Sequence, residues 1–257
     1  MSAVRLSACI ISYNEADRIG ACIDSLDFCD EILVVDSHST DGTREVAAVR
    51  GARIIERDWP GYRSQRQFAV NAATHDWILS IDADERVSPQ LRAELLALRD
   101  GGFAAIAGAS IPTLSTYFGA PLHHGNAWPD RHLRLFDRRR ASWGGFEIHE
   151  KILLAGPIAR LQGWFEHHPC RSFDEHVSKQ DRYATLMARH MHEHGLKANL
   201  AQVLCNPPLR FLRGMILKGG LLDGWRGLVY HLVEAGYVRR KYLRLYMLGR
   251  EARRKRE

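Results

Sequence analysis

Short apolar runs alternate with amphipathic segments along the first hundred residues of the chain. Runs rich in Ile, Leu and Val predict strands, and segments whose apolar positions recur at helical spacing predict the helices between them. The predicted strands are 6–11, 31–36, 52–56 and 77–82, and the predicted helices are 16–26, 43–50, 62–73 and 89–99. Strands joined through helices need crossover connections, so we expect an α/β fold with a mostly parallel sheet sandwiched by helices.

The pattern changes after about residue 103, where the alternation becomes less regular. Further strands are predicted at 103–111, 132–137 and 158–168. Beyond Pro169 the chain becomes helical, with an amphipathic helix predicted over 172–195 and helical segments around 208–219, 221–235 and 237–256. We therefore expect a helical C-terminal extension, whose first helix over 172–195 packs back on the sheet.

Three predicted strands end in loops that carry acidic side chains. The loops are 12–17 (SYNEAD), 36–43 (DSHSTDGT) and 82–85 (DADE). An unpaired carboxylate inside a strand that is buried on both faces would cost about 2–7 kcal/mol or more, so the acids belong at the strand ends. Ligands of parallel sheets bind outside the carboxyl ends of the strands, so we expect one site at this edge.

The net charge of +6 comes from the C-terminal tail. Residues 239–257 hold nine Lys or Arg against two Glu, a balance of +7, which leaves −1 for the first 238 residues. Tyr and Leu residues lie between these charges. This pattern is typical of helices that bind anionic membrane surfaces or nucleic acid, and also of solvated helical ends.

The remaining composition points to the cytosol. Five cysteines form no CxxC pair and mostly have apolar neighbours, which favours reduced core thiols without chemistry. The first apolar run is short and charged residues soon follow it, which favours a strand over a signal peptide. No stretch reaches the roughly 18–20 uninterrupted apolar residues of a spanning helix.

Asp82 and Asp84 are spaced so that both carboxylates can face one cation where the chain leaves a strand. Hard divalent ions such as Mg²⁺ and Mn²⁺ bind carboxylate and phosphate oxygens. Two acids in a turn also occur by chance, but the position after a buried strand favours a metal site. Asp36 has two compatible interpretations: bonding to the local backbone before a helix near Thr43, or accepting from the base or ribose of a nucleotide.

The motifs SYNEADRI, VVDSHSTDGT and SIDADE, in this order and spacing, resemble those of the family 2 glycosyltransferases, which have the GT-A fold. The segments WPDRHLRLFDR, WGGFEIHEKI, HHPCRSFDEHVSKQDRYATLMA and ILKGGLLDGWRGL are similar to the branch that adds sugars to the lipopolysaccharide core. The resemblance runs over nearly the whole chain. It implies a GT-A nucleotide-sugar-binding and catalytic domain over 1–170 and an amphipathic, basic helical extension over 171–257.

The resemblance also implies roles for the acidic strand ends. Asp82 and Asp84 match the DxD motif, which holds Mg²⁺ or Mn²⁺ on the donor diphosphate, where the metal neutralises charge on the departing nucleotide. Asp36 would read the base. The residues placed around the nucleotide are Tyr13, Asn14, Glu15 and Asp36.

An acceptor hydroxyl has a pKa far above 7, so a carboxylate must take its proton as the new bond forms. The segment GFEIHEKI offers Glu147 and Glu150. The resemblance aligns His149 and Glu150 with a VHE-like pattern, so we expect Glu150 to be the base, although an ion pair with Lys151 is the alternative. A structural histidine is the commoner fate, but a third metal ligand could come from His149, His167 or His168.

Arg131 and Arg134 alternate with leucines in PDRHLRLF, so we expect their side chains to share one face of a strand near the cleft. A planar guanidinium can bind two diphosphate oxygens at once, which makes both residues candidates for donor binding. Ordinary pairing with Asp130 or Asp137 is an equal alternative.

The resemblance implies an inverting, metal-dependent glycosyltransferase that moves one sugar to the lipopolysaccharide core or a related lipid-linked acceptor. UDP-glucose is the expected donor and β-glucosyl transfer the expected reaction. A hexosamine or heptose donor, a polyprenyl-linked glycan acceptor and the oligomeric state stay open. The QxxRW motif of processive synthases is absent, which favours addition of a single sugar. The C-terminal helices would dock peripherally on the inner face of the cytoplasmic membrane.

Two other classes fit the sequence less well. A sugar nucleotidyltransferase shares the architecture and the metal, but it carries a Gly-rich basic loop where this chain has SYNEAD. A nucleic-acid-binding module driven by 239–257 is disfavoured, because the first 238 residues have no basic surplus. We therefore expect a nucleotide sugar, a lipid-linked acceptor and an anionic membrane surface as partners, and no nucleic acid.

Overall fold

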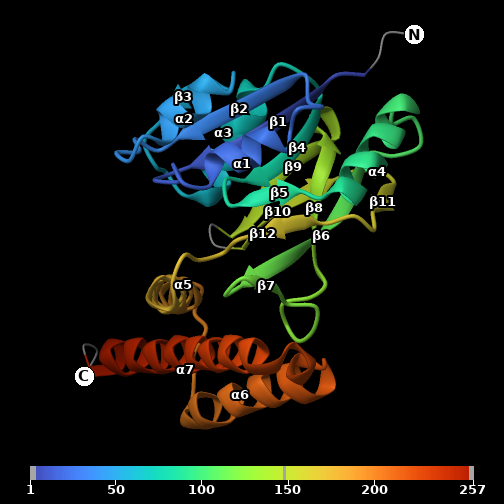
Figure 1. Cartoon of the computed structure of the whole chain (residues 1–257). Coiled ribbons are helices and arrows are strands. Elements are labelled where there is room, and N and C mark those ends of the chain that lie inside the picture. Colours follow the sequence, from blue (N-terminus) through green and yellow to red (C-terminus); the bar gives the residue numbers. More distant parts are fainter. Residues whose placement is uncertain (1–3, 147–148, 255–257) are drawn as a thin grey trace. The chain divides into compact units, whose positions relative to one another are not determined.

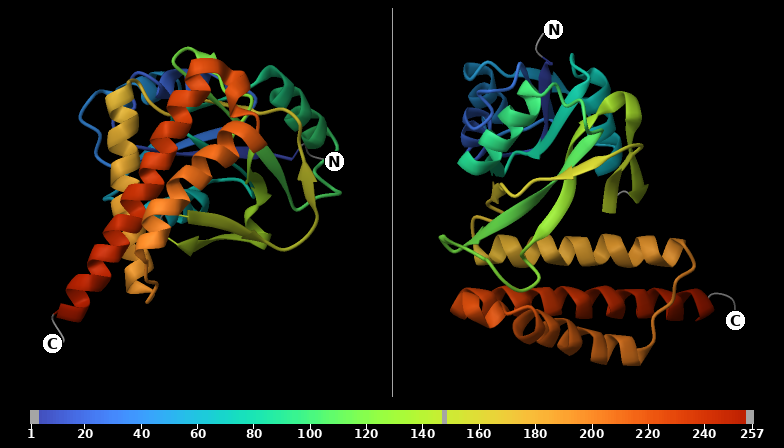
Figure 2. Two further views of the ribbon diagram at one scale, coloured as in Figure 1. Left: turned by 90° about the horizontal axis from the view of Figure 1, so that it is seen from below. Right: turned by 90° about the vertical axis from the view of Figure 1, so that its right-hand side faces the viewer.

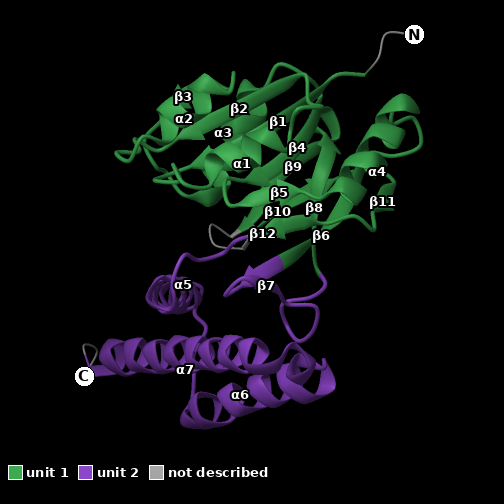
Figure 3. Ribbon diagram, in the orientation of Figure 1, with its two compact units in different colours: residues 1–114, 130–167 green, residues 115–129, 168–257 purple. Residues whose placement is uncertain are grey.

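The structure is a computed structural model that describes residues 4–146 and 149–254 (Figure 1). The chain divides into two compact units, which Figure 3 colours separately. The sheet unit comprises residues 1–114 and 130–167, and the helical unit comprises residues 115–129 and 168–257. Each unit is described by itself below.

Four parallel strands form one half of the main sheet in the sheet unit. β1 (Leu6–Ser12) lies between β2 (Glu31–Asp36) and β4 (Trp77–Asp82), and β3 (Arg53–Glu56) pairs with the other side of β2. β1 and β4 are buried almost throughout, which explains why their sequences are nearly continuous apolar runs. The four strands predicted in this region are confirmed.

Helices connect these strands and cover the sheet. They are α1 (Ile19–Asp24), α2 (Thr43–Val49), α3 (Tyr62–Ala72) and, after the short β5 (Glu85–Val87), α4 (Pro89–Asp100). α4 begins where a sequence signal places it, because the Ser88 side chain accepts from the Leu91 N–H and Pro89 fills the first turn.

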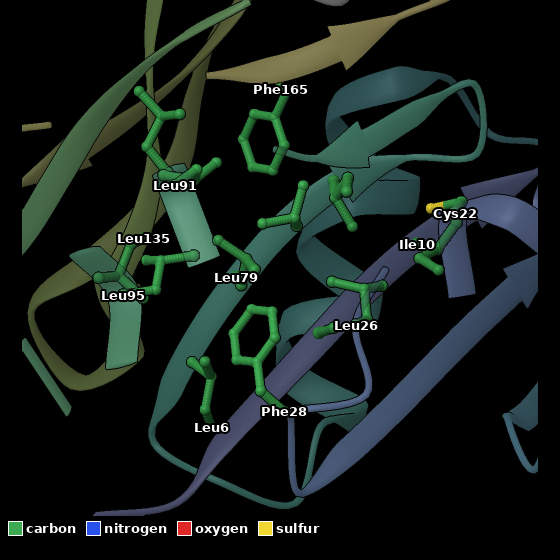
Figure 4. Packing of buried hydrophobic residues seen from close by; sticks show 14 of the residues in the cluster. Leu6, Ile10, Cys22, Leu26, Phe28, Leu79, Leu91, Leu95, Leu135 and Phe165 are labelled. Atoms are coloured by element: carbon green, nitrogen blue, oxygen red, sulfur yellow. The ribbon is translucent and has the colours of Figure 1, made fainter. Parts of the chain in front are cut away.

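Alternate residues of the parallel strands point into two hydrophobic clusters. In β2, Val34 belongs to the cluster that includes α1 and α4, whereas Leu33 and Val35 belong to the cluster that includes α3. Figure 4 shows the first cluster, where Leu79 of β4 and Leu95 of α4 are among the packed side chains. Because side chains alternate along a strand, two clusters mean that both faces of the sheet are covered.

The other half of the main sheet is largely antiparallel. β8 (Asp130–Asp137) pairs with β4 and with β6 (Gly108–Tyr117), whose last residues belong to the helical unit. Over the described residues the order is β3-β2-β1-β4-β8-β6-β12-β5, and β11 and β7 pair with β6. The remaining short elements are β7 (Ala120–Pro121), η1 (Arg138–Arg140), β11 (Ile158–Arg160) and β12 (Phe165–His167). A separate hairpin consists of β9 (Ala141–Phe146) and β10 (His149–Leu154).

Two predicted strands differ from the structure. The strand predicted over 103–111 starts only at Gly108, because the turn that ends α4 includes Phe103 and Gly102, both with positive φ. The strand predicted over 158–168 is divided into β11 and β12. Gly163 lies between them, and a Cβ there would meet the backbone of Leu91, so the chain approaches α4 closely instead of extending.

The helical unit consists mainly of α5 (Phe173–Glu193), α6 (Leu200–Leu212) and α7 (Gly224–Arg254), linked by η2 (Arg213–Leu217) and η3 (Gly220–Asp223). α5 and α6 both pack along α7 (Figure 2). The segments predicted over 221–235 and 237–256 are one helix, since Gly236 costs only about 1 kcal/mol relative to Ala in a helix interior. None of the described helices combines the length and hydropathy needed to cross a membrane.

A buried hydrogen bond in the helical unit predicts a pH-dependent stability. The Tyr117 hydroxyl lies 2.9 Å from His176 Nδ1, and the His176 side chain is 5% exposed. Burial, with a smaller effect of Lys179, lowers the pKa of His176 to about 4. Because the folded-state pKa is below the usual 6.5, the stabilisation is complete above pH 6.5 and is lost as the pH falls toward 4.

We therefore expect the urea midpoint of the wild type to fall between pH 7 and pH 4.5, and that of His176→Gln to fall less over the same interval. Circular dichroism measures both midpoints. An equal fall in the two proteins would show that the His176 ring does not contribute this acid sensitivity.

Candidate active site

The acidic strand ends meet at one edge of the sheet. Ser12 is the register partner of Asp36 across β1 and β2, and Ile11 is the partner of Asp82 across β1 and β4. Parallel strands in this register release their following loops at the same edge. The prediction that the three acidic loops share one edge is confirmed.

Asp36 holds the first two loops together. Its side chain is completely buried, and its Oδ2 accepts from Ser12 Oγ at 2.7 Å and from Ser39 Oγ at 2.6 Å. Its Oδ1 accepts from the Ser39 backbone N–H at 2.7 Å. These contacts are the local turn bonding that the sequence predicts. The second predicted role of Asp36, reading the nucleotide base, stays a prediction.

The first loop lies against the second loop through its backbone. Asn14 has a positive φ of 55°, and its N–H donates to Ser39 Oγ at 2.8 Å. The N–H of Glu15 donates to Thr43 Oγ1 at 2.8 Å. The Tyr13 side chain, in contrast, is 59% exposed. The loop therefore presents an aromatic ring at the edge while its backbone is fixed.

Asp82 lies between two arginines at the end of β4. Its Oδ1 is 2.7 Å from Arg66 Nη2, and its Oδ2 is 3.3 Å from Arg134 Nη2, which is also 2.9 Å from Glu85 Oε1. Burial alone would raise the pKa of Asp82, but Arg66 and Arg134 hold it well below its usual range. Burial raises the pKa of Glu85 despite Arg134. Asp82 is therefore more firmly ionised than Glu85.

Glu150 belongs to the same cluster through Arg66. The Arg66 Nε lies 3.1 Å from Glu150 Oε1, and the guanidinium stacks 5.2 Å from the centre of the Trp143 ring. The Glu150 side chain is 13% exposed, whereas Lys151 is at the next position of β10 and points to the opposite face. Arg66 of α3 therefore joins the predicted base to the predicted metal-binding strand end.

Asp84 has basic neighbours of a different kind. Its Oδ2 is 3.4 Å from His167 Nε2 and 4.0 Å from Arg18 Nη1. Arg18 also pairs with Glu15 of the first loop at 2.5 Å. Of the histidines considered as a third metal ligand, His167 therefore contacts the DxD segment, through Asp84. His168 belongs to the helical unit.

The residue types at this edge fit a divalent cation. Asp82 and Asp84 supply two carboxylates, His167 supplies an imidazole, and Asp82 Oδ1 is a buried oxygen that accepts no hydrogen bond despite its ion pair. Mn²⁺ accepts such a mixture of oxygen and nitrogen ligands. Among the side chains that the structure describes, which do not include His149, no three acidic, His or Cys side chains surround a common centre. A cation would therefore compete with the arginines for Asp82.

Several predicted residues are not part of this cluster in the described structure. Arg131 donates from Nη1 to the Leu161 carbonyl at 2.5 Å, away from the partners of Arg134. That both arginines share one face stays a prediction, because β8 is irregular between them: Leu135 and Leu133 are the register partners of the adjacent residues Ala109 and Ser110. The backbone of His149 lies in β10, but its side chain is not described, and Glu147 lies outside the described residues.

Sequence reasoning missed Arg66 and Arg18, and it placed Glu85 in the acidic loop without giving it a role. A signal for Arg66 exists in α3, where Gln65 and Arg66 precede Ala69 and Val70 by one helical turn and share their buried face. A charged residue on the apolar face of a predicted helix needs a buried partner. Nothing in the local sequence identifies that partner.

The fold is that of a GT-A type glycosyltransferase. The chain belongs to glycosyl transferase family 2, whose family model matches residues 7–153. The expected α/β fold of GT-A type and the helical C-terminal region are confirmed.

Known relatives agree with this assignment. The lipopolysaccharide core biosynthesis glycosyltransferase LpsC of Rhizobium meliloti (strain 1021) is 32% identical over 254 residues, which cover 92% of this chain and 93% of the relative. An uncharacterized glycosyltransferase of Rickettsia typhi is 28% identical over 246 residues, which cover 90% of this chain and 83% of the relative. The protein is thus a glycosyltransferase related to a lipopolysaccharide core enzyme.

Among solved structures, a mannosyltransferase from Pyrobaculum calidifontis in complex with GDP-Man and Mn²⁺ has the same fold. The TM-score is 0.55 at 15% sequence identity, over 94% of this chain and 86% of the mannosyltransferase. At this identity the similarity concerns the fold alone.

Proposed function

We propose that the protein transfers one sugar, with inversion, from a nucleotide diphosphate sugar to the lipopolysaccharide core or a related lipid-linked acceptor. One observation carries the proposal: Arg66 lies within 2.7 Å of Asp82 and 3.1 Å of Glu150. A candidate base and a candidate diphosphate site are therefore neighbours in one ionised cluster. Direct displacement needs these two groups on opposite sides of the reacting sugar.

Glu150 is the base of this mechanism. As the acceptor oxygen bonds to the anomeric carbon, the hydroxyl proton moves to the Glu150 carboxylate. The electron pair of the breaking carbon–oxygen bond leaves with the nucleoside diphosphate. Attack from the face opposite the leaving group inverts the anomeric centre, and no covalent enzyme intermediate forms. Arg66 keeps the Glu150 carboxylate oriented through its ion pair.

Asp82 and Asp84 hold Mg²⁺ or Mn²⁺ in this proposal, with His149 or His167 as the third protein ligand. When bound, the ion neutralises charge on the departing diphosphate. Arg66 and Arg134 then become available to diphosphate oxygens, which suit the planar guanidinium. The Mn²⁺ in the solved mannosyltransferase complex supports the choice of this ion for the first experiment.

The nucleotide occupies the first two loops in the same proposal. Asp36 and Asn14 fix the loop backbones, and the exposed Tyr13 ring offers a surface for a base. Glu15 completes the set assigned to the nucleotide. We propose UDP-glucose as the donor, and a β-glucosyl group as the sugar transferred.

A thermal-shift panel tests the nucleotide and the metal together. We expect UDP with Mn²⁺ to raise the unfolding temperature by several degrees. A ligand at about 100 times its Kd adds about 2.7 kcal/mol to the free energy of unfolding. GDP, ADP and CMP should add less, and Asp82→Ala combined with Asp84→Ala should abolish the shift. Asp27→Ala, at an exposed acid, is the matched control. A shift that survives the double substitution would contradict the proposal.

We also propose that the helical unit lies on the anionic inner face of the cytoplasmic membrane. Its sequence contains 18 Lys or Arg against 8 Asp or Glu, a balance of +10. Basic residues interrupt a series of exposed large apolar side chains, a combination that binds anionic lipid surfaces. This apolar patch comprises Leu204, Leu209, Leu212, Ile216, Leu217, Leu221 and Leu222.

A further inference from the structure

A groove in the helical unit has apolar walls. Its volume of 590 Å³ lies within the range of about 300–1,000 Å³ that small-molecule sites occupy. α7 contributes a stripe of residues three or four positions apart, and α5 contributes Phe173 and Val177 at the same spacing. The stripe on α7 consists of Trp225, Val229, Leu232, Val233 and Gly236.

Large apolar side chains around this groove are unusually exposed. Trp225 and Leu232 are each 54% exposed, Phe173 is 44% exposed, and Phe118, from the segment after β6, is 42% exposed. Single exposed apolar residues are normal on protein surfaces, but several around one hollow indicate a ligand or partner. The walls of the groove therefore favour a hydrocarbon occupant.

One end of the groove is basic. Arg239 and Arg240 follow Gly236 by three and four positions, so they continue the stripe one helical turn further. Arg239 is exposed. The Nε of Arg240 is 3.2 Å from Asp181 Oδ1, but its buried Nη2 has no hydrogen-bond partner. Asp181 also pairs with Arg244 at 2.8 Å, so one carboxylate serves two arginines and positive charge remains.

We propose that this groove binds one acyl chain of an anionic phospholipid, whose phosphate lies at Arg239 and Arg240. The inference rests on the membrane location proposed above. Apolar walls match the chain, and guanidinium groups match phosphate oxygens. A second copy of this chain is disfavoured as the occupant, because it would bring another unit of charge +10 to a basic surface.

Titration with monomeric lipid distinguishes binding in the groove from binding to a membrane surface. Isothermal titration of the full chain uses dihexanoyl phosphatidylglycerol below its critical micelle concentration, with dihexanoyl phosphatidylcholine for comparison. We expect the anionic lipid to bind at least about tenfold more tightly than the zwitterionic lipid, because it keeps its net charge beside two arginines.

Gly236→Leu fills the groove without an obvious cost to the fold. The atoms nearest to a Cβ at Gly236 belong to the flexible Arg240 side chain, the first of them at 3.2 Å, and Leu is the better helix former by about 1 kcal/mol. We expect this variant to lose monomeric lipid binding by about tenfold or more. Arg239→Glu should weaken binding of the anionic lipid more than that of the zwitterionic lipid, whose choline group offsets the charge of its phosphate.

Leu217→Ser is the matched control, because Leu217 is 81% exposed in the apolar patch and does not line the groove. It should bind monomeric lipid as the wild type does but bind phosphatidylglycerol vesicles less. Equal monomer binding by Gly236→Leu and the wild type would overturn the inference. So would binding without preference for the anionic lipid, or a dimer that Gly236→Leu dissociates.

The thermal-shift panel with nucleotides distinguishes the donor proposal from the lipid-groove proposal, because the nucleotides are proposed to bind the sheet unit and the lipid the helical unit. A wild type that binds monomeric lipid but shows no nucleotide shift would contradict the donor proposal and leave the lipid groove standing. A wild type with a nucleotide shift but no lipid binding would overturn the groove alone. Wild-type protein that ignores anionic vesicles at low salt would contradict the membrane location.

Discussion

Glu150→Gln is expected to lower kcat for sugar transfer by about 10²–10⁴-fold, the usual contribution of a general base. The amide has the size of the carboxylate but cannot take the proton of the acceptor hydroxyl. Its oxygen can still accept from Arg66 Nε, which lies 3.1 Å from Glu150 Oε1 in the wild type. KM for the donor should therefore change little. The measurement is steady-state release of the nucleoside diphosphate with a lipopolysaccharide core acceptor.

A control at the neighbouring position separates the role of the base from an effect on the hairpin. Lys151→Gln alters an exposed side chain at the next position of β10 and should keep kcat close to that of the wild type. The Mn²⁺-dependent nucleotide shift should be the same in both variants, because neither removes Asp82 or Asp84. If Glu150→Gln retains kcat within about threefold, another group must be the base.

The position of the acidic edge follows from local pattern and from a general property of parallel sheets. Ile78, Leu79 and Ile81 identify a buried strand, and Asp82 marks its end. Once three such strands are parallel and adjacent, their ends must align, and the register of Ser12 with Asp36 shows this alignment. No side-chain contact is needed for that inference, so sequence alone suffices.

The cluster itself depends on contacts that local pattern does not contain. Arg66 and Glu150 are 84 residues apart, and their ion pair exists only because α3 and the β9–β10 hairpin both pack in the sheet unit. Arg131 and Arg134 of β8 likewise have different partners: Arg134 contacts Asp82 and Glu85, whereas Arg131 donates to the Leu161 carbonyl. Pairing of distant segments, rather than propensity, decides these neighbours.

Arg66→Met is expected to destabilise the metal-free protein by about 3 kcal/mol, toward the lower end of the cost of breaking a buried ion pair. Its Nη2 and Nε serve Asp82 and Glu150, whose side chains are 28% and 13% exposed. Met fills similar apolar space beside Trp143 but leaves Glu150 without this cation. The loss is at the lower end because Arg134 still neighbours Asp82 at 3.3 Å. Urea unfolding in EDTA measures it.

Mn²⁺ should stabilise Arg66→Met more than the wild type, because the ion no longer competes with a guanidinium 2.7 Å from Asp82 Oδ1. The matched control is Arg92→Met, which breaks a pair whose side chains are 42% and 64% exposed and should cost only about 0–1 kcal/mol. Its response to Mn²⁺ should equal that of the wild type. Equal stabilisation of all three proteins by Mn²⁺ would mean that the ion binds away from Asp82, and the assignment of the DxD segment as the metal site would fail.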